Sequence, residues 1–276
     1  MRINPITKKE IKITARGAKF FIEFFVYELI LLIAFLLSLR TIMGKERIYV
    51  TDYQKLSGLF PVVAITQLFV ITMIIPVMTG AAIAGEKEKQ TFDIMLTTAV
   101  SPFQIIWGKM LSAVVRVMMF IIASIPLMSL SFLSGSIQWK ILFIFVLMAT
   151  VYSLFMAAIG IFTSSICAKT ITSIIFSYGI IFFISIGSLL WNVFERASIG
   201  RSTFSGVFLL FNPIVYFDEL FYVSSDKHIV SFVANGFLDD ANGTKWIILS
   251  TLAIVILSIL LVLLSARKIN PLKRKK

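Results

Sequence analysis

Long apolar runs separated by short polar segments dominate this chain. Six runs stand out, and each is about as long as the 20 or so residues that a helix needs to cross the bilayer core. They lie at about 20–39, 59–84, 105 or 111 to 133, 141–164, 171–191 and 246–266. The short alternating segments of an outer-membrane barrel do not occur. The pattern therefore predicts an all-α polytopic membrane protein with six transmembrane helices.

The polar connections are short, except for the segment 192–245 between the fifth and sixth spans. It contains two apolar pieces, at 204–217 and 228–238, which are too short to cross a bilayer. We expect re-entrant or interfacial short helices there, with a small extracytoplasmic cap as the alternative.

Basic residues gather at both ends of the chain. Residues 1–19 carry six Lys or Arg among scattered isoleucines, which favours an interfacial elbow helix over a disordered basic tail. Residues 267–276 form a second basic tail. We therefore divide the chain into an elbow segment (1–19), a six-span transmembrane domain (20–266) and a tail (267–276).

Composition supports a membrane protein and charge supplies its orientation. The chain is 58% hydrophobic and only 14% charged, whereas soluble proteins carry about a quarter charged residues. With the N-terminus inside, 16 of the 26 Lys and Arg residues fall on the inner side and 9 on the outer side. The net charge of +12 therefore reflects the positive-inside rule rather than binding to nucleic acid. Both termini and the segment after span two should face the cytosol.

That segment is unusually charged and is expected to form a short cytosolic helix at about 86–97. Glu86 and Glu88 would lie in its first turn, where acids suit the helix dipole. Its apolar residues recur at helical spacing and make one stripe: Phe92, Met95, Leu96 and Ala99. Such a helix could dock into a groove of a soluble partner, and a solvated loop is the alternative.

A second helix start follows this segment. Ser101, Pro102 and Gln104 have the spacing of a capping box with proline at the first helical position. We therefore expect a new helix to begin at Pro102 and to lead into span three.

Two features inside the spans have candidate roles. Glu28 and Arg116 lie at similar expected depths, so we predict an intramembrane charge pair, although both could instead snorkel to the headgroups. Span four carries a small-residue stripe that favours close helix packing over a substrate path: Ser153, Ala157, Gly160 and Ser164.

Several chemistries find no support in the sequence. With one cysteine, Cys167, and one histidine, His228, the chain can form no internal disulfide and no Cys/His zinc cluster. It has no G-x-x-x-x-G-K-[S/T] phosphate loop and no nucleophile–base constellation, so we expect neither an ATPase nor an intramembrane enzyme, and no metal or cofactor on this chain.

The segment from Gly85 to Lys109 resembles the signature of type-2 ABC exporter permeases. Gln90 departs from that signature, because many members have glycine there. The N-terminal NPITKKEIK and the pair Asn212-Pro213 are also similar to this family. The matching residues are Gly85, Glu86, Lys87, Glu88, Thr91, Asp93, Leu96, Thr97, Ser101, Pro102, Gly108 and Lys109.

This resemblance implies an ATP-driven exporter in a bacterial cell membrane. Two permease subunits, identical or different, would pair, and each would sit on a separate ABC ATPase subunit that binds ATP and Mg. The coupling residues would be Glu86, Lys87, Glu88, Lys89, Thr91, Phe92, Asp93, Met95 and Leu96. The 26 phenylalanines lean toward an amphipathic, lipid-like, peptide or antibiotic cargo. A stand-alone secondary transporter or channel is the alternative, but no internal repeat supports it.

Overall fold

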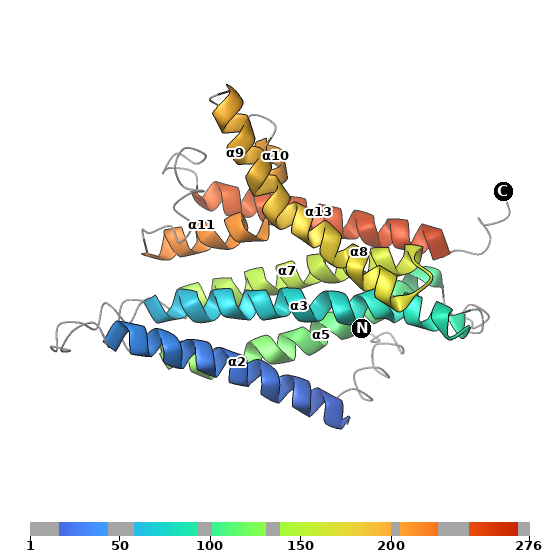
Figure 1. The fold of residues 1–276 in the computed structure, drawn as a ribbon, viewed down its shortest axis with the longest axis horizontal. Helices are drawn as coiled ribbons and strands as arrows, with labels where there is room; N and C mark the ends of the chain where they lie inside the picture. Colours follow the sequence, from blue (N-terminus) through green and yellow to red (C-terminus); the bar gives the residue numbers. More distant parts are fainter. Residues whose placement is uncertain are drawn as a thin grey trace. The chain divides into compact units, whose positions relative to one another are not determined.

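The fold is seen in a computed structural model of the whole chain, which describes residues 17–43, 58–92, 101–130, 139–199, 205–225 and 243–269. Every regular element in these ranges is a helix (Figure 1). Six of the helical stretches are long and apolar enough to span a membrane, which confirms the predicted number of spans. They run over Phe20–Thr41, Leu59–Glu88, Pro102–Ser129, Trp139–Ile166, Thr170–Glu195 and Thr244–Ile269.

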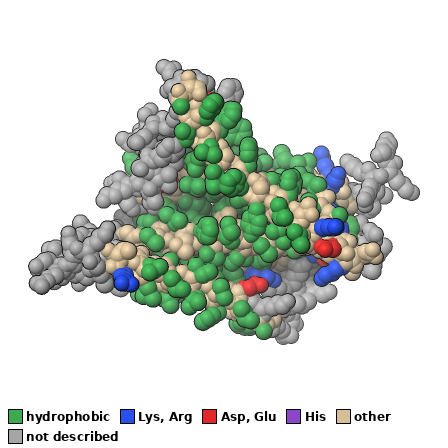
Figure 2. Space-filling model, in the orientation of Figure 1, with side chains coloured by type: hydrophobic (Ala, Val, Ile, Leu, Met, Phe, Trp, Pro, Cys, Tyr) green, Lys and Arg blue, Asp and Glu red, His purple; other side chains and the backbone are tan. Residues whose placement is uncertain are grey.

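The surface of these helices is apolar, as a bilayer requires. Figure 2 shows hydrophobic side chains over most of the visible helix surface, with charged side chains gathered mainly toward helix ends. In the apolar window of the first span only 17% of the residues are buried, and the share in the last span is also 17%. In the fourth span the share is 56%. Exposed apolar surface on this scale is stable only against lipid or another protein.

The chain divides into two compact units. The first unit contains the described parts of Met1–Ile75 and Trp107–Ser153. Its elements are helix α2 (Ala18–Met43), the first part of α3 (Leu59–Glu88), most of α5 (Pro102–Ala123), α6 (Ile125–Ser129) and the first part of α7 (Trp139–Ile166).

Aromatic contacts hold the helices of the first unit together. Phe120 of α5 stacks on Tyr27 of α2 with ring centroids 5.1 Å apart, and it also contacts Phe20 and Phe24.

The end of the predicted third span is not one regular helix. Pro126 lies in the first turn of α6, where a missing N–H is tolerated, so the span continues past Ala123 through a second short helix.

The second unit contains the described parts of Pro76–Ile106 and Leu154–Lys276. It includes the C-terminal parts of α3 and α7 and the start of α5. The remaining elements are α8 (Thr170–Phe182), the π-helix η3 (Phe183–Gly187), α9 (Ser188–Ile199), α10 (Ser205–Leu209), α11 (Pro213–Ser225) and α13 (Gly243–Ile269).

In the second unit, α8, η3 and α9 follow one another without a break, and α11 packs against α13. Helices α10 and α11 occupy the part of the outer loop where short re-entrant helices were expected. The second apolar piece of that loop, the elbow segment up to residue 16 and the tail from residue 270 lie outside the described residues.

Candidate functional site

The C-terminal end of α3 carries the charged residues of the signature segment. Helix α3 runs through Gly85 and ends at Glu88. The N–H of Thr91 donates to the carbonyl of Glu86 at 3.0 Å, and the N–H of Gln90 donates to that of Lys87 at 3.1 Å. These two bonds form a Schellman motif, which closes a helix around one left-handed residue. That residue is Gln90, with φ of 59°, in a position where glycine is the usual choice.

This geometry corrects the expected start of the coupling helix. Glu86 and Glu88 belong to the last turn of α3, not to the first turn of a new helix. The expected stabilisation of these acids by the positive N-terminal end of a helix dipole therefore does not apply to them. Span two was expected to end at residue 84, but α3 continues through Gly85 to Glu88, and the chain first reverses at the left-handed Gln90. The expected helix begins no earlier than Phe92, whose side chain is buried, and residues 93–100 lie outside the described residues.

Lys87 binds the C-terminal end of α7. Its Nζ donates to the carbonyl of Ser165 at 2.6 Å and to that of Cys167 at 3.2 Å, and it lies 3.5 Å from that of Ser164. The last carbonyls of a helix have no partner within the helix and carry its partial negative charge. A lysine is therefore well suited to this position. The same ammonium group lies 5.7 Å from the ring centroid of Phe92.

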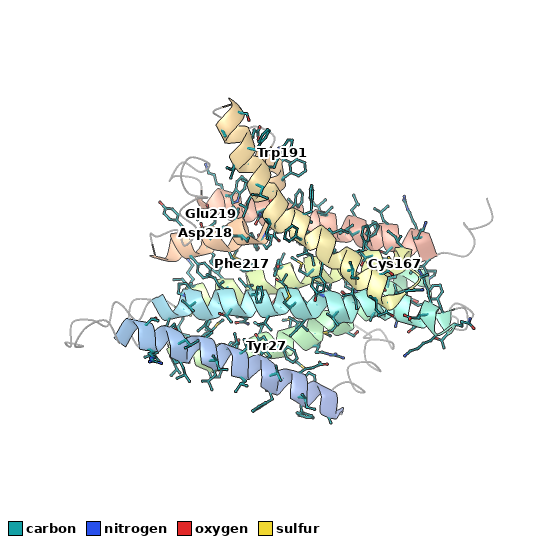
Figure 3. The ribbon with its side chains drawn as sticks, viewed as in Figure 1. Tyr27, Cys167, Trp191, Phe217, Asp218 and Glu219 are labelled. Carbon is teal, nitrogen blue, oxygen red and sulfur yellow. The ribbon has the colours of Figure 1, made fainter. Side chains whose placement is uncertain are left out.

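Glu88 binds the N-terminal end of α8. Its carboxylate accepts the backbone N–H of Thr170, the first residue of α8, at 2.9 Å. First-turn N–H groups lack a partner within the helix and attract anions. Lys87 and Glu88 thus bind the two sides of the turn that joins α7 to α8, where Figure 3 labels Cys167. We call these two residues and their backbone partners the α3 clamp.

A close approach of α3 and α7 supports the clamp from within. The hydroxyl of Ser164 accepts the N–H groups of Ile83 and Ala84, at 2.9 and 2.8 Å. One turn earlier, a Cβ added at Gly160 would overlap Oγ1 of Thr79. Two residues of the small-residue stripe therefore lie directly against α3. The others, Ser153 and Ala157, are fully buried.

The start of α5 is the part of this region that was most legible in the sequence. The N–H of Gln104 donates to Oγ of Ser101 at 3.3 Å, and the N–H of Ser101 donates to Oε1 of Gln104 at 3.2 Å. Helix α5 begins at Pro102. The capping box is therefore confirmed, with both of its reciprocal hydrogen bonds formed.

The remaining predicted coupling residues fall into two groups. Lys89 and Thr91 are exposed, and the hydroxyl of Thr91 donates to the carbonyl of Glu86 at 3.3 Å. The residues Asp93, Met95 and Leu96 lie outside the described residues.

The intramembrane charge pair has a different acid from the one expected. Arg116 Nη1 lies 3.6 Å from the carboxylate of Glu23, not from that of Glu28. Similar depth suggested Glu28, but the partner depends on which face of α2 meets α5. Glu28 Oε1 is buried and has no hydrogen-bond partner among the described residues.

Asn212 has a structural role that the sequence did not reveal. Its Oδ1 accepts the N–H groups of Ile214 and Val215 and so caps α11. Its Nδ2 donates to the carbonyl of Ser185 at 2.6 Å and to Oγ of Ser188 at 2.7 Å, and lies 3.3 Å from the carbonyl of Ile184. Asn212 thus joins α11 to the π-helix. The Asn-Pro pair was a signal for the cap but not for the distant partners.

The described residues offer no group of three or more His, Cys, Asp or Glu side chains that could hold a metal ion. The fold and this region together define a multi-pass helical membrane protein with a charged clamp at one end of three of its helices.

Its family follows from comparison with known proteins. The sequence model of the family described as "ABC-2 family transporter protein" matches residues 4–267, so the chain belongs to that family. A search among curated proteins finds no match for it. Members of the family are membrane permeases of ABC transporters, and such permeases in general work with an ABC ATPase.

Proposed function

We propose that this chain is the permease subunit of an ATP-driven exporter of an amphipathic cargo, driven by a separate ABC ATPase that binds ATP and Mg. Membership of the ABC-2 family supports the transport role, and the charge distribution favours both termini in the cytosol. The membrane in which it would act is the bacterial plasma membrane. Two such subunits, identical or different, would complete the transporter.

The α3 clamp is the observation that supports coupling. The signature segment begins in the last turn of α3, and Lys87 and Glu88 bind backbone groups at the ends of α7 and α8. A displacement of the segment by the ATPase would therefore move the ends of three helices together. Without these bonds the end of α3 could move alone, and its displacement would not be transmitted to α7 and α8.

The clamp can be tested without knowing the cargo. We would purify the chain with a candidate ABC ATPase that co-purifies with it and measure ATP hydrolysis in lipid nanodiscs. In the same sample, the rate of maleimide labelling of Cys167 would report on the α7–α8 turn, because this is the only cysteine of the chain. In the unaltered complex we expect ATP and Mg to change that rate severalfold.

The decisive variant replaces both clamp side chains with apolar ones that can form neither contact, as Lys87→Met with Glu88→Met. We expect ATP hydrolysis to persist while the ATP-dependent change in Cys167 labelling is lost. Lys140→Met is the matched control, because it removes an exposed lysine outside the signature segment. A clamp variant that keeps the labelling change would show that coupling takes another route. A chain that neither binds an ATPase nor supports ATP turnover would overturn the proposed function itself.

A further inference from the structure

Three helices of the first unit bring buried polar side chains together deep within their spans. Tyr27 comes from α2, Gln67 from α3 and Ser124 from the junction of α5 and α6, and none of them is more than 1% exposed. Oγ of Ser124 lies 3.1 Å from Oε1 of Gln67. The hydroxyl of Tyr27 faces both residues, and Glu28 follows it on α2. We call these four residues the polar cluster.

The polar cluster has more hydrogen-bonding groups than it uses. Among the described residues, Nε2 of Gln67 and Oε1 of Glu28 have no hydrogen-bond partner, and the Tyr27 hydroxyl forms no well-aligned hydrogen bond although Ser124 and Gln67 lie beside it. A buried polar group without a partner costs roughly 1–3 kcal/mol in proteins, and water is scarce at this depth of a bilayer. Polar groups inside membranes pair with one another or with backbone carbonyls, or they mark a substrate path, and the unpaired atoms of this cluster favour the second case.

Other buried hydroxyls of the same chain show the contrast. Tyr152 shares a 2.6 Å hydrogen bond with Thr72, and Tyr216 shares a 2.8 Å hydrogen bond with Thr251. The chain thus pairs two comparable tyrosines across helices. The hydroxyl of Tyr27 is equally buried but forms no comparable well-aligned bond, and Nε2 of the neighbouring Gln67 has no hydrogen-bond partner among the described residues.

An aromatic wall adjoins the polar cluster. The ring of Phe120 stacks on that of Tyr27, and Phe20 and Phe24 continue the wall along α2. Figure 3 shows Tyr27 on α2. The most apolar window of α2 is only 17% buried, so comparatively little packing opposes its separation from its neighbours. A polar group and an apolar chain could thus be bound side by side.

We propose that the polar cluster binds the polar end of the transported molecule when α2 moves away from α3 and α5. The group bound must both donate and accept hydrogen bonds, because Gln67 Nε2 requires an acceptor and the Glu28 carboxylate requires a donor. A hydroxyl or an amide satisfies both, and the aromatic wall receives the attached apolar chain. This inference rests on the proposed ATP-driven function and names the part of the cargo that the spans recognise.

Cysteine accessibility tests whether the polar cluster opens. In a Cys167→Ser background we would make Ser124→Cys, a nearly isosteric change, and Gln67→Cys. Both would be exposed to a small water-soluble methanethiosulfonate in nanodiscs with the ATPase. We expect labelling at least about tenfold faster with ATP and Mg than without. Ala149→Cys is the control, because Ala149 is equally buried in α7 of the same unit and should stay protected.

A second arm tests the chemical class. Decanoyl-N-methylglucamide, which carries hydroxyls and an amide, should slow the labelling of Ser124→Cys in the presence of ATP. Decyltrimethylammonium, with the same chain length and no hydrogen-bond donor, should not. Equal protection by both amphiphiles would overturn the assigned class.

The two proposals fail in different ways. ATP hydrolysis without faster labelling of either cysteine would overturn the inference, and it would assign the unpartnered atoms to bound water. Absence of ATP hydrolysis would instead contradict the proposed function. Equal labelling of Ala149→Cys would show general loosening of the unit, which also counts against a specific site.

Discussion

At the scale of single residues, Gly160 permits the contact on which the α3 clamp depends. A side chain at this position would overlap Oγ1 of Thr79 and lie 2.9 Å from its Cβ, closer than real Cβ contacts come. Because Gly160 has no side chain, α7 can approach α3 closely at this point. Ser164, one turn later on α7, can then reach the N–H groups of Ile83 and Ala84. The small residues of span four therefore matter for the distance between two helices.

We predict that Gly160→Ala lowers the stability of the purified chain by about 1–3 kcal/mol, the usual cost of overpacking. The measurement is the midpoint of thermal unfolding in detergent. Adding Thr79→Ala should restore part of the loss, because it removes one of the two overlapping atoms. Gly179→Ala is the control and should be neutral or mildly stabilising, since an added Cβ there meets nothing within 4 Å. Equal losses at both glycines would contradict this account.

At the scale of elements, Asn212 connects the short helices of the outer loop to the fifth span. A π-helix carries one extra residue in a turn and is often found at functional positions. The amide of Asn212 donates to a carbonyl of η3 and also caps α11. The side chain of Asn212 therefore links α11 to η3, because its Nδ2 donates to η3 and its Oδ1 accepts from α11.

We predict that Asn212→Asp destabilises the chain although it keeps the capping oxygen, because the donor to η3 is lost and a charge is buried in its place. Losing these bonds should cost roughly 2–3 kcal/mol, which lowers the unfolding midpoint by about 5–10 °C. Ser198→Ala is the comparison, since the hydrogen bond that this exposed hydroxyl forms among the described residues lies within α9. A midpoint that matches the unaltered chain would show that the amide is dispensable.

At the scale of the whole molecule, orientation in the bilayer determines which end meets an ATPase. The excess of Lys and Arg on one side predicts a cytosolic location for the turn between α7 and α8. Cys167 lies in this turn and its side chain is partly exposed. The protein therefore has a natural probe of its own topology.

We predict that a membrane-impermeant maleimide labels Cys167 in inside-out vesicles and not in right-side-out vesicles. The readout is the mass shift of the purified chain, with Cys167→Ser as the unlabelled control. Labelling from the opposite side would reverse the assigned orientation and place the α3 clamp away from any cytosolic ATPase.

The sequence alone was sufficient for features that depend on nearby residues or on total apolar length. The six spans follow from runs long enough to cross a bilayer, and the start of α5 follows from Ser101 and Gln104, which lie three residues apart and bind each other. The signature from Gly85 to Lys109 was enough to indicate the family that the comparison then showed.

Only the tertiary structure decided which distant groups meet. It showed that Glu86 and Glu88 lie in the last turn of α3, because that helix continues to Glu88 and the chain reverses only at Gln90. It paired Arg116 with Glu23, because the faces that α2 and α5 present to each other cannot be read from depth. It also brought Tyr27, Gln67 and Ser124 together from three helices. Local patterns determine where a helix begins and how long it is, whereas its partners depend on its rotation and on the packing of its neighbours.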